Sequence, residues 1–148
     1  MKAVVLTMLA SLVACHDEKA KGRDDGFEPV LRAHLDALRD GRVDQACAVV
    51  KLGYDACTLH QPPDAGASWC DARQICERDY VARLRAVAPY LPGAKVSSYR
   101  EEIVGQDLGY VRVIAHVHLE GARGGGNLAF EAVRYGDPWQ ILRAPTAE

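Results

Sequence analysis

The sequence has no long hydrophobic run, few aromatic side chains and no excess of positive charge. Aromatic residues make up 7% of the 148 residues. The apolar stretch at residues 3–13 is shorter than the ~20 residues that a membrane-spanning helix needs. Without residues 1–14, 17 basic and 20 acidic side chains leave a net charge of −3 with His neutral. No basic stripe is available to neutralise phosphates, so we expect no nucleic-acid partner.

The chain also lacks an internal repeat, a second domain and a recognised catalytic signature. Its length allows one domain, and 49% hydrophobic with 26% charged residues is a globular balance. The glycine run at residues 124–126 precedes a strand pattern rather than a helix, so it is not the context of a phosphate-binding loop. These absences favour a non-enzymatic domain without cofactor or metal.

The N-terminus carries a short leader-like segment. Lys2 precedes the apolar stretch, which ends in Leu12-Val13-Ala14-Cys15. This ending resembles a bacterial lipobox, in which the cysteine is acylated and becomes the first mature residue. It predicts a signal peptide at residues 1–14, lipidation of Cys15, and a polar tether over residues 15–26. The alternatives are an ordinary secretory signal or an N-terminal helix.

The lipobox reading also predicts where the protein resides. A lipidated Cys15 makes membrane lipid a partner and places the domain in the bacterial cell envelope. His16 follows the cysteine, where Asp favours inner-membrane retention in enterobacteria. We therefore expect an anchor in the outer membrane that faces the periplasm.

Residues 27–144 are expected to form a single α+β domain that begins with three helices. Apolar residues at helical spacing predict the first helix over residues 27–40, with His34 as a satisfied, semi-buried histidine. A shorter helix should follow at residues 44–52. The third should begin at Ser68, with Asp71 completing a partial capping box, and run to residue 88.

Four strand patterns follow the helices, at residues 95–104, 109–119, 127–135 and 139–143. In residues 109–119, valines, an alanine and a leucine alternate with Arg112, Ile114, His116 and His118, which indicates a half-buried strand. The connections, at residues 105–108, 120–126 and 136–138, are short enough for hairpins. The helices should therefore pack on a curved four-stranded antiparallel meander.

Four cysteines remain after Cys15, and an even number in an exported chain predicts disulfide bonds. Of three pairings, Cys70 with Cys76 is disfavoured because one helix would hold them about 9 Å apart, beyond the ~7 Å reach of a disulfide. A helical hairpin favours the nested pairs Cys47–Cys76 and Cys57–Cys70. Zinc bound by the four thiolates is an alternative, but the spacings are unlike paired short knuckles.

The polar side of the meander carries the candidate site. The register that keeps the other side apolar pairs Val117 with Leu128, which places Glu131 beside His116 and His118. Pairing Tyr135 with Trp139 would set Glu131 opposite Arg143. The predicted polar face therefore comprises His116, His118, Glu131, Arg112 and Arg143, with Glu101 nearby and Tyr99, Tyr135 and Trp139 at its rim.

Four readings of this polar face remain open. The favoured one is a solvent-exposed sheet surface with cross-strand charge pairs. The face could also line a ligand pocket. His116 or His118 with Glu131 could act as an acid–base pair, because a His beside a carboxylate titrates near neutral pH. Two histidines with a glutamate could bind a metal.

The order of elements resembles the nuclear-transport-factor-two-like superfamily, a cone of α+β structure. The likeness rests on the opening HLDALRDGRVDQAC at residues 34–47 and on the closing Tyr135-Gly136-Asp137-Pro138-Trp139-Gln140-Ile141 hairpin. Members include dehydratases, isomerases and many proteins without activity, so the resemblance implies a fold and leaves the activity open. We expect a non-catalytic domain that binds an envelope protein or a small ligand. The alternative is a small cone-fold enzyme of dehydratase, isomerase or hydrolase type.

Overall fold

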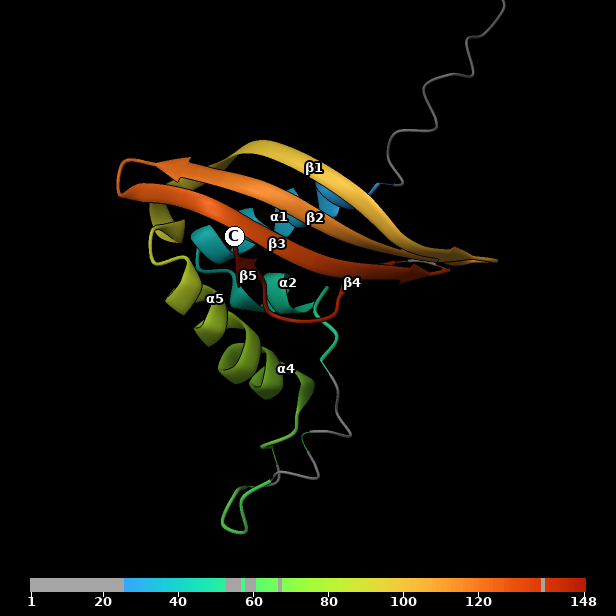
Figure 1. Ribbon diagram of the computed structural model, residues 1–148. Coiled ribbons are helices and arrows are strands. Elements are labelled where there is room, and N and C mark those ends of the chain that lie inside the picture. Colours follow the sequence, from blue (N-terminus) through green and yellow to red (C-terminus); the bar gives the residue numbers. More distant parts are fainter. Residues whose placement is uncertain (1–25, 53–56, 58–60, 67, 137) are drawn as a thin grey trace, which may run out of the picture.

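The computed structural model describes residues 26–52, 57, 61–66, 68–136 and 138–148. The expected signal peptide, Cys15 and nearly all of the expected tether lie outside these residues. The described chain is an α+β domain in which helices cover one side of a long, curved antiparallel sheet (Figure 1). The predicted fold class is therefore confirmed.

Helix α1 (Phe27–Arg39) packs against the sheet through its predicted apolar stripe, because Phe27, Leu31, Leu35 and Leu38 are all buried. Gly41, with φ of 75°, follows the helix end. Helix α2 (Val43–Cys47) is shorter than predicted. The chain beyond it runs beside the sheet, where the Lys51 amide donates to the Ile141 carbonyl at 2.8 Å.

The third helix is continuous but begins later than predicted. It consists of α4 (Ala72–Ile75), a π-helical turn (Cys76–Val81) and α5 (Ala82–Val87). Its N-cap is Asp71 and not the predicted Ser68. The Asp71 side chain accepts a hydrogen bond from the Arg73 amide at 2.9 Å. Cys70 therefore precedes the helix, and a short 3₁₀ turn (Leu91–Gly93) leads from its far end towards the sheet.

The sheet has the predicted meander and one additional strand. Its strands are β1 (Ala94–Asp107), β2 (Tyr110–Gly121), β3 (Gly124–Tyr135), β4 (Trp139–Ile141) and β5 (Thr146–Ala147), in the order β1-β2-β3-β4 with β5 also paired to β3. The expected loop at residues 120–126 is mostly strand. Gly126 belongs to β3, where a Cβ atom would lie 2.6 Å from the Tyr90 hydroxyl. The sheet also continues past residue 144 to Ala147.

His34 joins the three helical segments inside the core. Its Nδ1–H donates to the Ala46 carbonyl at 2.9 Å, and its Nε2 accepts from the Tyr80 hydroxyl at 2.6 Å. The side chain of His34 is 3% exposed and that of Tyr80 is fully buried. Burial lowers the pKa of His34 to about 4. The imidazole is therefore neutral at physiological pH and serves as a structural crosslink, with both ring nitrogens satisfied.

Both predicted disulfides are present. Cys47–Cys76 ties the end of α2 to the third helix, with the two Cα atoms 5.8 Å apart. Cys57–Cys70 joins the connecting segment to the residue just before Asp71, with a Cα separation of 5.7 Å. The nested pairing is therefore confirmed, and the sulfurs are not available as four zinc ligands.

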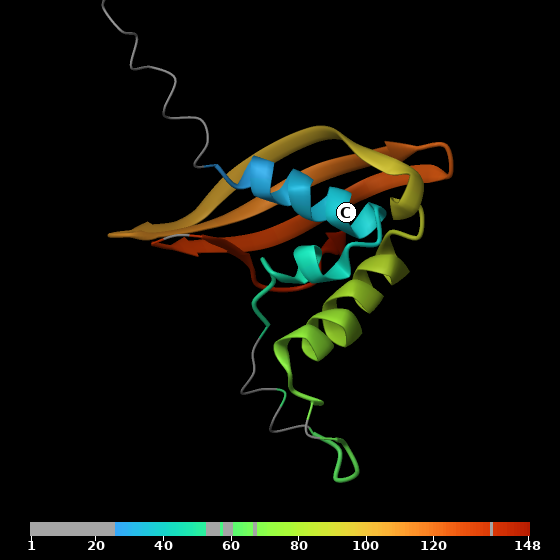
Figure 2. The same ribbon diagram turned by 180° about the vertical axis from the view of Figure 1, so that it is seen from behind.

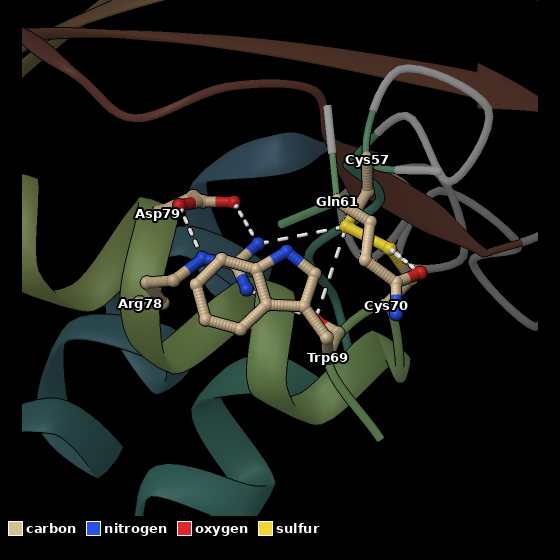
Figure 3. The surroundings of a disulfide bond; sticks show 6 residues. All are labelled: Cys57, Gln61, Trp69, Cys70, Arg78 and Asp79. Atoms are coloured by element: carbon tan, nitrogen blue, oxygen red, sulfur yellow. Dashed lines mark hydrogen bonds and ion pairs between the residues drawn. A yellow bond between two sulfur atoms is a disulfide. The ribbon is translucent and has the colours of Figure 1, made fainter. Parts of the chain in front are cut away.

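The Cys57–Cys70 bond sits beside an arginine that lies over an indole ring (Figure 3). The Arg78 guanidinium carbon is 4.0 Å from the centre of the Trp69 ring, and Arg78 also donates to the Trp69 carbonyl at 2.9 Å. Asp79 pairs with the same guanidinium at 2.8 Å, which helps to lower the pKa of Asp79. The disulfide is therefore braced by the third helix.

Candidate functional site

The candidate site is the sheet face directed away from the helices, which we call the polar face. The pairing of β2 with β3 is as predicted, with Val117 opposite Leu128 and Ala115 opposite Phe130. These residues are buried against the helices. By alternation, His116, His118 and Glu131 share the opposite face, as the sequence indicated.

Glu131 is held between two arginines. Its side chain is 6% exposed and accepts from Arg112 Nε at 2.6 Å and from Arg143 at 2.5 Å. The Glu131 carboxylate raises the pKa of Arg112 chiefly through this hydrogen bond. The expected association of Glu131, Arg112 and Arg143 is present, and it forms a triad with a net charge of +1 in which both carboxylate oxygens are occupied.

His116 is paired with carboxylates other than Glu131. Its Nδ1 lies 2.6 Å from an oxygen of Glu148, and its Nε2 lies 3.9 Å from an oxygen of Glu102. The Nε2 atom is buried and makes no hydrogen bond to any residue that the structure describes. Because a general base must reach the proton of a substrate, this shielded nitrogen is poorly placed for catalysis.

His118 is fixed by an amide. Its Nδ1 lies 2.6 Å from Oδ1 of Asn127, its cross-strand partner. An amide oxygen only accepts, so Nδ1 of His118 carries the proton and donates. The two histidines therefore hold separate partners rather than one shared carboxylate.

A bulge in β1 moves two predicted neighbours off the polar face. The register shifts between Val96 and Ser98, so that Tyr99 lies opposite Val117 and Glu101 lies opposite Ala115. Ser97 occupies the bulge and donates through its hydroxyl to the His118 carbonyl at 3.2 Å. One extra residue exchanges the two faces of a strand. The prediction of Tyr99 and Glu101 on the polar face is therefore wrong, and Glu102 lies there.

Trp139 also faces the helices and not the rim of the polar face. It lies opposite Arg134, one residue away from the predicted pairing with Tyr135. Trp139 is 5% exposed, and its ring centre is 5.5 Å from that of Phe27. Burial of the large indole against α1 favours this register. Arg143 still reaches Glu131, diagonally across the strands.

Sequence reasoning missed the partners of the histidines. Glu148 reaches His116 because β5 pairs Thr146 with Ala129 and brings the chain end back along β3. A strand of two residues is too short to show alternation, so no sequence pattern predicted β5. Asn127 was within a predicted strand, and its position opposite His118 follows from the same register that placed Glu131.

Among the hollows in the structure, two that include apolar lining residues lie on the helical side. One hollow has a volume of about 460 Å³ and lies beside α1 and α2. Its lining residues include Val30, Ala33 and Val49. The other, of about 280 Å³, is lined by residues that include Leu38, Leu84 and Leu91. Neither includes a residue of the polar face. Within the described ranges no group of three or more His, Cys, Asp or Glu could hold a metal ion, and no helix is long and apolar enough to cross a membrane.

Comparison of the chain with family models, curated proteins and solved structures finds no match. The likeness to the cone-shaped superfamily therefore stays a prediction. The candidate site is defined by its own contacts, which are the Arg112–Glu131–Arg143 triad and the two partnered histidines.

Proposed function

We propose that this protein is an exported, lipid-anchored envelope lipoprotein whose domain binds a partner without catalysing a reaction. One observation carries the proposal: a domain with two disulfide bonds follows a segment that resembles a lipobox. Disulfides persist in oxidising compartments and are rare in the cytosol. The bonds therefore support export, and Cys15 supports attachment to lipid once the chain is exported.

The contacts on the polar face support binding over catalysis. Glu131 is occupied by Arg112 and Arg143, so it is not free to act as a base or to orient an imidazole. His116 uses Nδ1 for Glu148 and has its other nitrogen buried. The rival enzyme that pairs a histidine with Glu131 would require these contacts to break first.

The fold supports membership of the cone-shaped superfamily as a further part of the proposal. The domain has the helices followed by a curved antiparallel meander that the resemblance implies. Many members of that superfamily have no enzymatic activity. For this chain the outer-membrane location, facing the periplasm, is part of the same proposal.

Replacement of Cys15 tests the anchor. Full-length wild type and Cys15→Ser are expressed in a bacterium, and the membrane and soluble fractions are compared after high-salt washing. Mass spectrometry of the N-terminal peptide identifies acyl chains. The matched control is Ser11→Ala, which changes the same leader and leaves Leu12-Val13-Ala14-Cys15 intact. Wild type and the control should be acylated and membrane-bound.

The Cys15→Ser variant should either leave the membrane fraction or accumulate as an uncleaved precursor. If it fractionates and is processed like the wild type, the lipobox interpretation is wrong. Affinity purification of the acylated protein from solubilised membranes, followed by mass spectrometry, tests the binding role. Turnover of a co-purified small molecule that is lost in His116→Gln would instead establish the rival enzyme.

A further inference from the structure

Exposed apolar side chains gather at one end of the sheet. The large hydrophobic residues that are exposed in the described part of the chain are Ile103 (58%), Val104 (43%), Leu108 (96%) and Tyr135 (79%). Leu108 lies in the turn between β1 and β2, Ile103 and Val104 lie near the end of β1, and Tyr135 ends β3. We call these residues the apolar tip.

Strand pairing holds the apolar tip together. Tyr110 pairs with Asp107 on one side and with Tyr135 on the other. The Gly136 amide also donates to the Gly109 carbonyl at 3.1 Å. The end of β3 is thus tied to the β1–β2 turn, so Leu108 and Tyr135 belong to one structural unit.

The apolar residues surround the tip instead of forming one flat patch. Ile103 pairs with Val113, whose side chain faces the helices, whereas Tyr135 follows Glu131 and Val133 on the polar face. Leu108 lies at the turn itself. Both ribbon views show this end of the sheet extending past the helices (Figures 1 and 2). A projecting end with apolar groups on both sides suits insertion between lipid headgroups better than docking onto a flat protein surface.

The tether joins the domain at this same end. Phe27 begins α1, and its ring lies 5.5 Å from Trp139, which pairs with Arg134 beside Tyr135. Both ribbon views place the start of α1 towards the apolar tip (Figures 1 and 2). Residues 16–25 can extend to about 35 Å at most. A lipid on Cys15 would therefore keep the tip near the bilayer and raise its effective concentration there.

We propose that the apolar tip is a second membrane contact, which inserts into the interfacial region of the bilayer to which Cys15 is anchored. The proposal rests on the lipid anchor proposed above. Tyrosine is suited to this region because its ring is amphipathic. Asp107 lies next to Leu108, and Arg112 and Arg134 are set back along the strands. With mixed charge around the tip, burial of apolar surface is the main attraction and anionic headgroups are secondary.

Quenching by brominated lipid tests this contact. The acylated full-length protein is inserted into vesicles of phosphatidylethanolamine and phosphatidylglycerol, with part of the lipid brominated. Leu108→Trp supplies a reporter at the tip, and its 96% exposure means that the change should leave folding intact. The matched control is Arg123→Trp in the β2–β3 turn, at the opposite end of the same sheet. Wild type provides the background emission of its own tryptophans.

The expected result is strong extra quenching in Leu108→Trp and none in Arg123→Trp. Equal quenching in both variants, or none in Leu108→Trp, overturns the second contact, and acylation of the N-terminal peptide then shows that the anchor itself stands. An unacylated peptide overturns the anchor and the tip contact together. A crosslinked dimer through the tip in lipid-free solution would assign this surface to a second copy of the chain instead.

Discussion

Acidification from about pH 7 to about pH 4.5 should destabilise the folded domain through the buried imidazole of His34. In the folded state burial lowers the pKa of His34 to about 4 from its ordinary value of 6.5. Between these values the unfolded chain binds a proton that the folded chain does not. The stability that depends on neutral His34 is therefore fully present above about pH 6.5 and is lost as the pH falls towards about 4.

The size of the effect follows from the difference in pKa. Each pKa unit corresponds to about 1.4 kcal/mol. The lowered pKa of His34 should therefore reduce the free energy of unfolding by up to about 3 kcal/mol on acidification. Domains of this size are commonly stable by about 5–15 kcal/mol. Protonation of one side chain would thus remove a substantial share of the free energy of unfolding.

Urea unfolding at a series of pH values, followed by tryptophan fluorescence, measures this dependence. His34→Gln should be less stable than wild type near neutral pH, because Tyr80 and the Ala46 carbonyl lose a well-placed partner. The difference between wild type and His34→Gln should shrink as the pH falls. His118→Gln is the control, since its ring lies outside the core. An identical pH dependence for wild type and His34→Gln would refute the reasoning.

Three further predictions concern the crosslinks and the polar face. Glu131→Gln should lower the free energy of unfolding by about 1–3 kcal/mol in thermal or urea unfolding, because a buried ionic acceptor for two arginines is lost; an unchanged midpoint would show that the triad contributes nothing. Cys47→Ser with Cys76→Ser should cost about 3–4 kcal/mol, as expected for a disulfide across a separation of 29 residues, checked under non-reducing conditions. Replacing His116 and His118 with Gln should change stability by about 1 kcal/mol or less, and a larger loss would show that the polar face is a packed site.

The central part of the sheet could be predicted because its alternation is unambiguous. Val113, Ala115 and Val117 cannot face water without exposing Phe130 and Leu128 as well, so only one register buries them all. The nested disulfide pairs could also be predicted, because a hairpin of two helices brings Cys47 towards Cys76 and Cys57 towards Cys70. The prediction of the Cys57–Cys70 pair was right although the expected start of the third helix was wrong.

The edges of the candidate site could not be predicted. A bulge at Ser97 needs no special residue, yet it exchanges the faces of Tyr99 and Glu101. Trp139 suits either a wet rim or a core, and its contact with Phe27 decided the outcome through packing between residues far apart in the sequence. Local patterns do not contain such information.

The two edges of the sheet differ in how they can pair with strands of other chains. The edge beyond β3 is covered by β4, β5 and residues 49–51. At the opposite edge of the described sheet, β1 is the outermost strand. An outer strand can recruit a foreign strand and start aggregation. β1 has two register shifts and three successive charged residues, Arg100, Glu101 and Glu102, which disfavour that pairing. A high local concentration of this protein should therefore not drive strand-to-strand polymerisation.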